Sequence, residues 1–312
     1  MKNATRGNPS PVLALALALA TLAAVTPAQA ITTTWTAFTG DWSEPTNWSD
    51  GEPTAIDDAL IASGIASVSQ SGETCASLQL GQGGTSGAVQ AIAGSLDVEG
   101  ALVVGEGDPA SIGTFQQVGA SVTAQSLDLA RGAFSLNNGD FTTETSVMRL
   151  GGSFSVILTG EFTNTGALTV EFGSGFTVTG GTLTIGTDPA DEALMGGTFN
   201  DSATPVMSFQ NLAFDGDMAV FHVQLSSFGL ATISVAGTLT LDGVLQIIDT
   251  EAPDGRYDIA TAASVVGDFD LVEFPEGDWT WGVEDNTLFV IKGQQSPVAG
   301  ATWSQVRRTF AR

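Results

Sequence analysis

The sequence predicts an all-β protein whose body is a parallel β-helix, or β-solenoid, with coils of about 20 residues and a cap at each end. Three observations predict this fold: a phenylalanine that recurs at regular intervals, a glycine that recurs in phase with it, and the overall composition. The chain has 38 Gly and only nine Lys and Arg in 312 residues, and it is rich in Thr, Ser and Val. This composition suits many short strands joined by tight turns.

The phenylalanine and glycine repeats keep the same phase over four units. The phenylalanines are separated by 19, 20 and 22 residues, and the glycines by 20, 21 and 20. Each phenylalanine begins a short alternating run, each glycine follows it as a turn, and a second alternating run comes next. Two registers in phase favour a solenoid over a β-sandwich with coincidental spacing. We expect the phenylalanines to stack in one interior row, each stabilising the fold by about 1.5–3 kcal/mol. The repeated positions are Phe115, Phe134, Phe154 and Phe176, and Gly119, Gly139, Gly160 and Gly180.

The first thirty residues have the pattern of a secretory signal peptide. Lys2 and Arg6 give a positive start, residues 12–25 form an apolar stretch, and Ala28 to Ala30 provide a small-residue cleavage site. We therefore expect cleavage near Ala30, with an uncleaved anchor as the alternative. The apolar stretch is short for a membrane span, and no later stretch is long enough for one.

The remaining sequence divides into four parts. Residues 31–80 are expected to form an N-terminal cap and the first strands, and residues 81–190 the solenoid repeats. Residues 191–293 change character and are expected to form a C-terminal β module that continues or caps the solenoid, because an open end would pair with other strands. Residues 294–312 are expected to form a linker and a short amphipathic tail.

The charge distribution excludes some classes of partner. Residues 31–312 carry seven basic and 34 acidic side chains, for a net charge of −27. A surface of this charge repels nucleic acids and anionic membranes. It is typical of a soluble extracellular protein, and the sequence leaves the oligomeric state open.

The two flanks and the repeats resemble a known group of proteins. Trp35, Gly40-Asp41-Trp42, Asn47-Trp48 and Asp57-Asp58 are similar to the opening of many secreted bacterial β-helix proteins. These include autotransporter passenger regions and proteins with PEP-CTERM sorting tails. The resemblance implies a β-helix but no particular activity. The sequence has no segment similar to their translocator barrel, and no Pro-Glu-Pro motif followed by an apolar helix.

Motifs for catalysis are weak, and we predict no catalytic residue and no cofactor. His222 is the only histidine, and no Gly-x-Ser-x-Gly nucleophile motif is present. Gly105 and Gly107 are followed by another strand rather than by the helix that a dinucleotide site requires. Cys75 is the only cysteine, and we expect it to fill a small space in the core. The many carboxylates leave a glycosidase pair open.

Three groups of residues are weak candidates for ligand binding. A calcium site is one alternative for the carboxylates of Asp188, Asp191 and Glu192. Sugar stacking is one alternative for Trp35, Trp42 and Trp48, although we expect these rings to cover the first coil. Arg131 and Arg149 are 18 residues apart, about one coil, and they are expected either to line a groove or to be solvated turn residues.

The C-terminal tail has the pattern of a short amphipathic helix. Thr302 and Gln305 fit a capping box. The tail resembles short Thr-Trp-Gly-x-Ile-Lys ends of some exported bacterial proteins, which implies a sorting tag, whereas a disordered or docked tail is the alternative. Its tag residues would be Trp303, Val306, Arg307, Arg308, Phe310 and Arg312.

Taken together, these features favour an exported structural or adhesive protein that acts at the cell surface or in the extracellular matrix. Its partners would be extracellular polysaccharide or surface proteins, and no catalysis is expected. The alternative is a β-helix protein that binds or cleaves polysaccharide.

Overall fold

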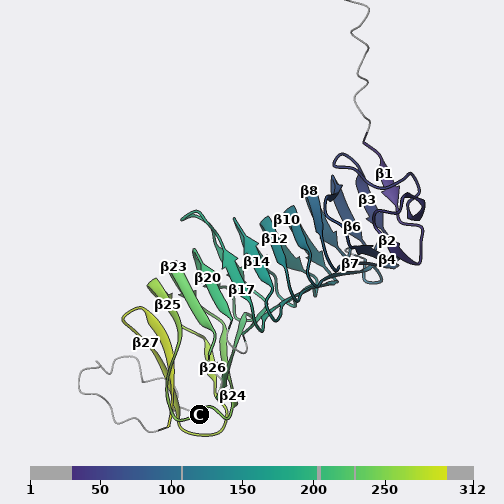
Figure 1. Ribbon diagram of the computed structural model, residues 1–312. Coiled ribbons are helices and arrows are strands. Elements are labelled where there is room, and N and C mark those ends of the chain that lie inside the picture. Colours follow the sequence, from purple (N-terminus) through teal and green to yellow (C-terminus); the bar gives the residue numbers. More distant parts are fainter. Residues whose placement is uncertain (1–29, 107, 202–204, 228–229, 294–312) are drawn as a thin grey trace, which may run out of the picture. The chain divides into compact units, whose positions relative to one another are not determined.

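A computed structural model describes residues 30–106, 108–201, 205–227 and 230–293. The body from Ile31 onward is all-β apart from a single short 3-10 helix, η1 (Pro45–Asn47), within the described residues. Its strands stack coil upon coil in sequence order, so the predicted β-solenoid is confirmed (Figure 1). The predicted signal peptide and the tail at 294–312 lie outside the described residues.

One wall of the solenoid, called sheet C here, is an 11-stranded parallel sheet to which each coil contributes one strand. Side chains alternate along each strand between the core and the outer surface, as the pleat requires. The strands are β2 (Thr39–Asp41), β4 (Gly64–Val68), β7 (Ser86–Ala91), β9 (Ile112–Gln117), β11 (Ala133–Leu136), β13 (Ser153–Val156), β16 (Gly175–Val178), β19 (Thr198–Asp201), β22 (Val220–Ser226), β24 (Val244–Thr250) and β26 (Leu271–Glu273).

The second sheet, sheet A, has 17 strands and includes two segments of most coils, although the first coils contribute only β1 and β3. In several coils two short strands follow each other, and in others one long strand covers both positions: β8 pairs with β5 through its first half and with β6 through its second. The strands are β1 (Thr32–Thr34), β3 (Asp58–Ile61), β5 (Glu73–Cys75), β6 (Ser77–Leu80), β8 (Ser95–Val104), β10 (Ser121–Ala130), β12 (Asp140–Arg149), β14 (Glu161–Asn164), β15 (Leu168–Val170), β17 (Thr182–Ile185), β18 (Ala193–Met195), β20 (Val206–Phe209), β21 (Leu212–Phe214), β23 (Thr232–Leu241), β25 (Gly255–Gly267), β27 (Trp279–Glu284) and β28 (Thr287–Lys292).

The predicted phenylalanine row lies in the core on the inner side of sheet C. Phe134 is the direct register partner of both Phe115 and Phe154, and its ring centroid lies 4.7 and 4.8 Å from theirs. Phe176 continues the row at 5.2 Å from Phe154. All four rings are buried, so the prediction of one stacked interior row is confirmed.

The row extends further than the sequence predicted. Phe199 and Phe221 continue it along β19 and β22, and a second pair of rings, Phe141 and Phe162, faces it from sheet A. The step between register partners in sheet C is 23 to 26 residues before Phe115, falls to 19 at Phe115–Phe134, and rises again to 27 at Leu245–Val272. The last coils are longer mainly because their strands are longer: β24 and β25 have seven and 13 residues, whereas β11 and β12 have four and ten.

The repeated glycines act in two different ways. Gly139 has φ +87°, a backbone conformation that favours glycine. The other three, Gly119, Gly160 and Gly180, do not have a positive φ, so backbone conformation alone does not explain the glycine at these turns. A Cβ at Gly160 would lie 2.8 Å from the carbonyl oxygen of Leu136, and one at Gly180 2.6 Å from that of Leu158. Close approach of the preceding coil therefore requires these two glycines.

The C-terminal end is closed by antiparallel pairing. The hairpin β27–β28 turns at Asp285 and Asn286, both with positive φ, and β28 then pairs antiparallel with β25. A two-residue turn in which both φ angles are positive matches the right-handed twist of the two strands it joins. The parallel coils thus begin before residue 81 and continue past residue 190 up to β26, and the hairpin covers their end.

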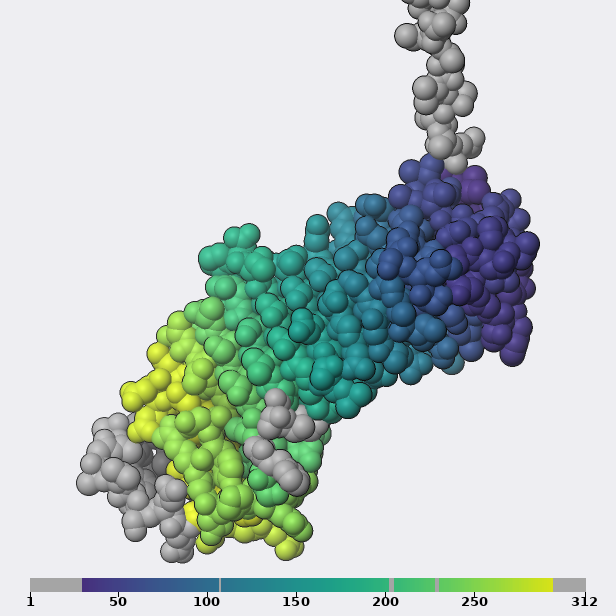
Figure 2. Space-filling view, in the orientation of Figure 1, coloured from purple at the N-terminus to yellow at the C-terminus, as the bar shows by residue number. Residues whose placement is uncertain are grey.

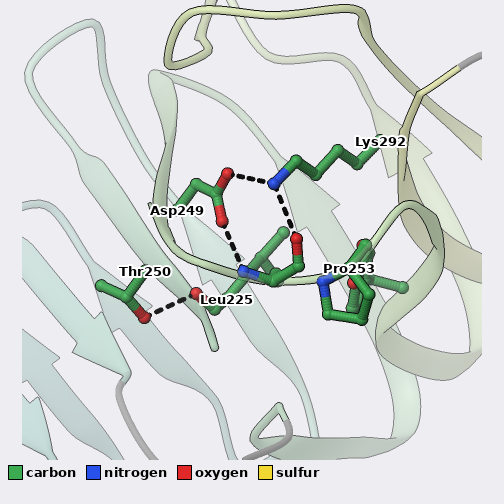
Figure 3. Close-up of polar contacts among 7 residues, drawn as sticks. Leu225, Asp249, Thr250, Pro253 and Lys292 are labelled. Carbon is green, nitrogen blue, oxygen red and sulfur yellow. Dashed lines mark hydrogen bonds and ion pairs between the residues drawn. The ribbon is translucent and has the colours of Figure 1, made fainter. Parts of the chain in front are cut away.

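A polar clasp fastens the last strand to the preceding coil. The Nζ of Lys292, in β28, lies 2.6 Å from Oδ2 of Asp249 and donates to the carbonyl oxygen of Ala252 at 2.6 Å. Asp249 also accepts from the Ala252 amide at 2.9 Å, and Thr250 donates to the carbonyl of Leu225 (Figure 3). Within the described residues, no helix is long and apolar enough to cross a membrane.

Candidate interaction surface

The outer surface of sheet C is the most unusual surface of this acidic protein. We call face C the outward side chains of eight successive strands, β4, β7, β9, β11, β13, β16, β19 and β22. These strands contain no Lys, Arg or Glu, and their single Asp, Asp201, points into the core. Face C therefore carries no acidic or basic side chain apart from His222.

Sheet A has a different outer surface. Acidic side chains occur on β3, β8, β10, β12 and β14, and several accept hydrogen bonds from neighbouring coils. Asp97, for example, accepts from Thr123 one coil further on. The two walls are built from the same repeat, so the lack of charge belongs to face C and not to the coil as a whole.

A ladder of uncharged polar side chains runs along the middle of face C. Each member is the register partner of the next, and some are joined by hydrogen bonds: Gln90 donates to Gln116 at 3.3 Å, and Asn200 to Thr177 at 3.2 Å. Neighbouring strands in a sheet lie about 4.8 Å apart, so the ladder presents polar groups at that interval. Its members are Ser67, Gln90, Gln116, Ser135, Ser155, Thr177, Asn200 and His222.

Small and aliphatic side chains flank this ladder. On one side lies a column of mostly small residues, whose side chains project little from the sheet. Ile92 and Val118 are exposed where their strands end on the other side. No Trp, Tyr or Phe points outward from these eight strands. The column of small residues comprises Ile65, Ala88, Thr114, Ala133, Ser153, Gly175, Thr198 and Val220.

The two titratable groups in these strands do not add charge to face C at neutral pH. Partial burial lowers the pKa of His222, although the charge of Glu273 opposes this shift, so the imidazole is neutral. Burial raises the pKa of Asp201 to about 7, although a hydrogen bond from the Gln224 amide opposes this shift. Asp201 faces the core, and so face C is uncharged at and above neutral pH.

The three N-terminal tryptophans lie in the interior and cover the first coil. Trp48 packs edge-on against Trp35 and Trp42, with ring centroids 5.0 and 4.8 Å apart, and its Nε1 donates to the carbonyl of Trp42 at 2.7 Å. All three are almost completely buried. Their rings are covered, which favours the expectation that they cap the first coil over the alternative of sugar stacking.

The two arginines of the repeats lie on adjacent coils but do not line a groove together. Arg149 is the neighbour in register of Ala130, and its side chain pairs with Asp128, from Nε to Oδ1 at 2.9 Å. Arg131 follows Ala130 at a corner with φ +54°. Of the four basic side chains in the described residues, Arg149, Arg256 and Lys292 are engaged in ion pairs.

The calcium candidates do not form a metal site in the described structure. The carboxylate of Asp191 accepts hydrogen bonds from the backbone amides of Thr187 and Asp188 at 2.8 and 2.7 Å, and these bonds stabilise the loop that contains it. Asp188 and Glu192 lie in the same exposed loop. In the part of the chain that the structure describes, no three His, Cys, Asp or Glu side chains are grouped to hold a metal ion.

Sequence reasoning missed a buried carboxylate at the N-terminal end. Glu73 is only 4% exposed and occupies an inward position whose register partner is Leu96. Burial raises its pKa to about 8, and the hydrogen bond with Glu52 and the charges of Glu52 and Asp41 act in the same direction. Cys75, two residues on, is also buried, which confirms the predicted core position, and burial raises the pKa of its thiol.

The surface outside face C has shallow hollows that are open to solvent. One lies on sheet A where Asp97, Glu99 and Glu144 flank threonines of successive coils. Another lies at a corner beside Phe172 and Met218. The face seen in Figure 2 has closely packed side chains and no deep hollow.

No protein-family model matches this chain, and neither a curated protein nor a solved structure is detectably similar to it. The resemblance to secreted bacterial β-helix proteins therefore remains a prediction. Face C itself could have been found in the sequence, because the residues that alternate with the core phenylalanines are all uncharged. Glu73 gave no such signal, since nothing in its short strand separates it from a surface glutamate.

Proposed function

We propose that this chain is an exported structural or adhesive β-solenoid that acts at the cell surface or in the extracellular matrix and makes its contacts through face C. One observation carries the proposal: eight successive strands present no acidic or basic side chain apart from a neutral histidine, in a chain of net charge −27 between residues 31 and 312. Charge is depleted from the centres of protein interaction surfaces, because an unpaired charge loses its hydration there.

Other features support a role outside the cytoplasm. The first thirty residues have the pattern of a signal peptide, and the solenoid presents a similar uncharged surface on eight successive coils. A repeated surface suits contacts with extended or repeating partners. Because ion pairs engage three of the four basic side chains in the described residues, an anionic polysaccharide would find few counter-charges there.

The test is binding of the full chain to cells that produce it and to their extracellular material. Thr177→Glu places a charge in the centre of face C, and Thr163→Glu places the same charge at an outward position of sheet A, as a matched control. We expect Thr177→Glu to lose at least tenfold in affinity and Thr163→Glu to bind like the wild type. Equal binding by all three proteins would contradict the proposal.

A further inference from the structure

We propose that face C binds a second copy of this chain, so that two solenoids pack sheet to sheet in a reversible dimer. This inference rests on the proposed function, because it names the partner of the contact surface proposed above. It commits to self-association and treats a saccharide partner as an outcome of the test.

The distribution of charge favours contact through face C over contact through sheet A. Two copies that each carry a net charge of −27 repel one another, and contact through sheet A would place the carboxylates of β8, β12 and β14 close to those of the partner. Like charges opposed across an interface cost several kcal/mol. Face C is the wall on which the two copies can approach without opposing charges, and the carboxylates of sheet A point away from such a contact.

The relief of face C suits packing between sheets. Ala88, Thr114, Ala133, Ser153 and Gly175 form successive steps of one column, and their short side chains project little from the sheet. Stacked sheets pack about 10 Å apart, and small side chains allow that distance. The polar ladder beside this column can donate and accept hydrogen bonds across the contact.

The aliphatic groups at the borders of face C would also lose water on association. Ile92 and Val118 are exposed and adjoin one another at one border, where each follows its strand, and Ile112 is exposed at the opposite end of β9. Exposed apolar groups that adjoin one another favour a protein partner. The absence of outward aromatic rings on the eight strands argues against a sugar, which such rings would bind by stacking.

The area of face C sets the expected strength of the contact. Eight strands about 4.8 Å apart, each presenting about four residues at 3.3 Å, give roughly 500 Å² per copy. A dimer would bury roughly 1,000 Å² in total, the lower limit for a specific interface. The association should therefore be reversible, with a dissociation constant of about micromolar or weaker.

Sedimentation velocity on the full chain over a range of protein concentrations tests this inference. We expect the mean mass of the wild type to rise from monomer toward dimer, and to rise at lower protein concentration when added salt screens the repulsion between the acidic copies. Thr177→Glu should shift the midpoint of association at least tenfold upward, whereas Thr163→Glu should behave like the wild type. Circular dichroism of both variants checks that each keeps the wild-type fold.

A wild type that stays monomeric at all concentrations would overturn self-association. If Thr177→Glu nevertheless loses binding to cells or to their extracellular material, the proposed function stands and the partner is another molecule, such as a neutral saccharide. Equal weakening by Thr163→Glu would overturn the assignment to face C, because that side chain lies on the other sheet.

Discussion

Lys292 and Asp249 join the last strand of the chain to a coil 43 residues earlier, with Nζ and Oδ2 2.6 Å apart. Burial alone would raise the pKa of Asp249, but the hydrogen bonds from Lys292 and Ala252 outweigh this effect, and the pKa is lowered. A carboxylate with a lowered folded-state pKa stabilises the protein above its unfolded pKa of about 3.8, and this contribution is lost as the pH falls through the folded pKa.

Replacing Lys292 should therefore loosen the C-terminal hairpin at neutral pH. In Lys292→Met, Asp249 keeps its charge and its hydrogen bond from the Ala252 amide but loses its ion-pair partner, so amides of β28 should exchange with solvent faster than in the wild type. Hydrogen exchange followed by mass spectrometry measures this. The double variant Lys292→Met/Asp249→Asn should recover part of the protection. Unchanged exchange in Lys292→Met would show that the clasp does not hold the hairpin.

The phenylalanine row should dominate the stability of the central coils. Phe134 contacts three other buried rings, so Phe134→Ala should lower the free energy of unfolding by about 3–5 kcal/mol. Phe172 is 65% exposed, and Phe172→Ala is the matched control, with an expected change below about 0.5 kcal/mol. Urea unfolding followed by circular dichroism compares the two. Similar losses in both variants would contradict the packing described here.

Backbone conformation predicts opposite effects at two corners of the solenoid. Leu158 is 63% exposed with φ +57°, so Leu158→Gly should relieve strain and raise stability by up to about 1 kcal/mol. At Gly139, with φ +87°, an added Cβ would lie 2.1 Å from the carbonyl oxygen of Ala120. Gly139→Ala should cost more than about 1 kcal/mol. Thermal unfolding tests both, and a stabilising Gly139→Ala would refute the argument.

Glu73 should make the N-terminal cap sensitive to alkaline pH. Its pKa is raised from 4.5 to about 8, so the folded chain binds this proton more tightly than the unfolded chain. Stability is then fully present below about pH 4.5 and falls as the pH rises toward 8. Glu73→Gln mimics the protonated form and should remove this part of the slope. Urea unfolding at pH 5 and pH 9 measures the difference, and equal slopes in wild type and variant would contradict it.

Catalysis provides a separate test of the functional proposal. We expect no hydrolase or lyase turnover on neutral or anionic polysaccharides by the full chain. The sheet A hollow beside Asp97, Glu99 and Glu144 brings carboxylates of adjoining coils together, as a glycosidase pair would require. Turnover that Glu99→Gln or Glu144→Gln abolishes, with folding intact, would make this chain an enzyme.

The predictable part of the fold was the part that repeats. The nearly constant spacing of the phenylalanines from Phe115 to Phe176 predicts that they are register partners on successive coils. Residues in register on neighbouring strands stack directly. The double contact of sheet A was predictable only in part, because β10 and β12 bend near Gln125 and Glu144 with no proline or glycine there, whereas β8 and β23 have a glycine at the bend. The roles of Gly160 and Gly180 depend on the backbone of the preceding coil, which local sequence does not describe.

The candidate site was predictable only in part. Burial of the three tryptophans followed from their place before the first repeat. The core phenylalanines also indicate which residues face outward in most strands of face C, but β4 and β7 contain no phenylalanine, so their outward residues could not be identified in this way. The raised pKa of Glu73 depends on Glu52 and Asp41, which lie 21 and 32 residues away in the sequence. Contacts of that kind come from the coil geometry and not from local spacing.

The location of the protein tests the central claim most directly. Thr163→Cys places one thiol at an outward position of sheet A, while Cys75, the only natural cysteine, is buried with a raised pKa and should not react. A maleimide that cannot cross membranes is added to intact cells that produce the variant and to their medium. We predict labelling of Thr163→Cys there and none of the wild type. Labelling of the variant only after lysis would contradict an exported surface or matrix protein.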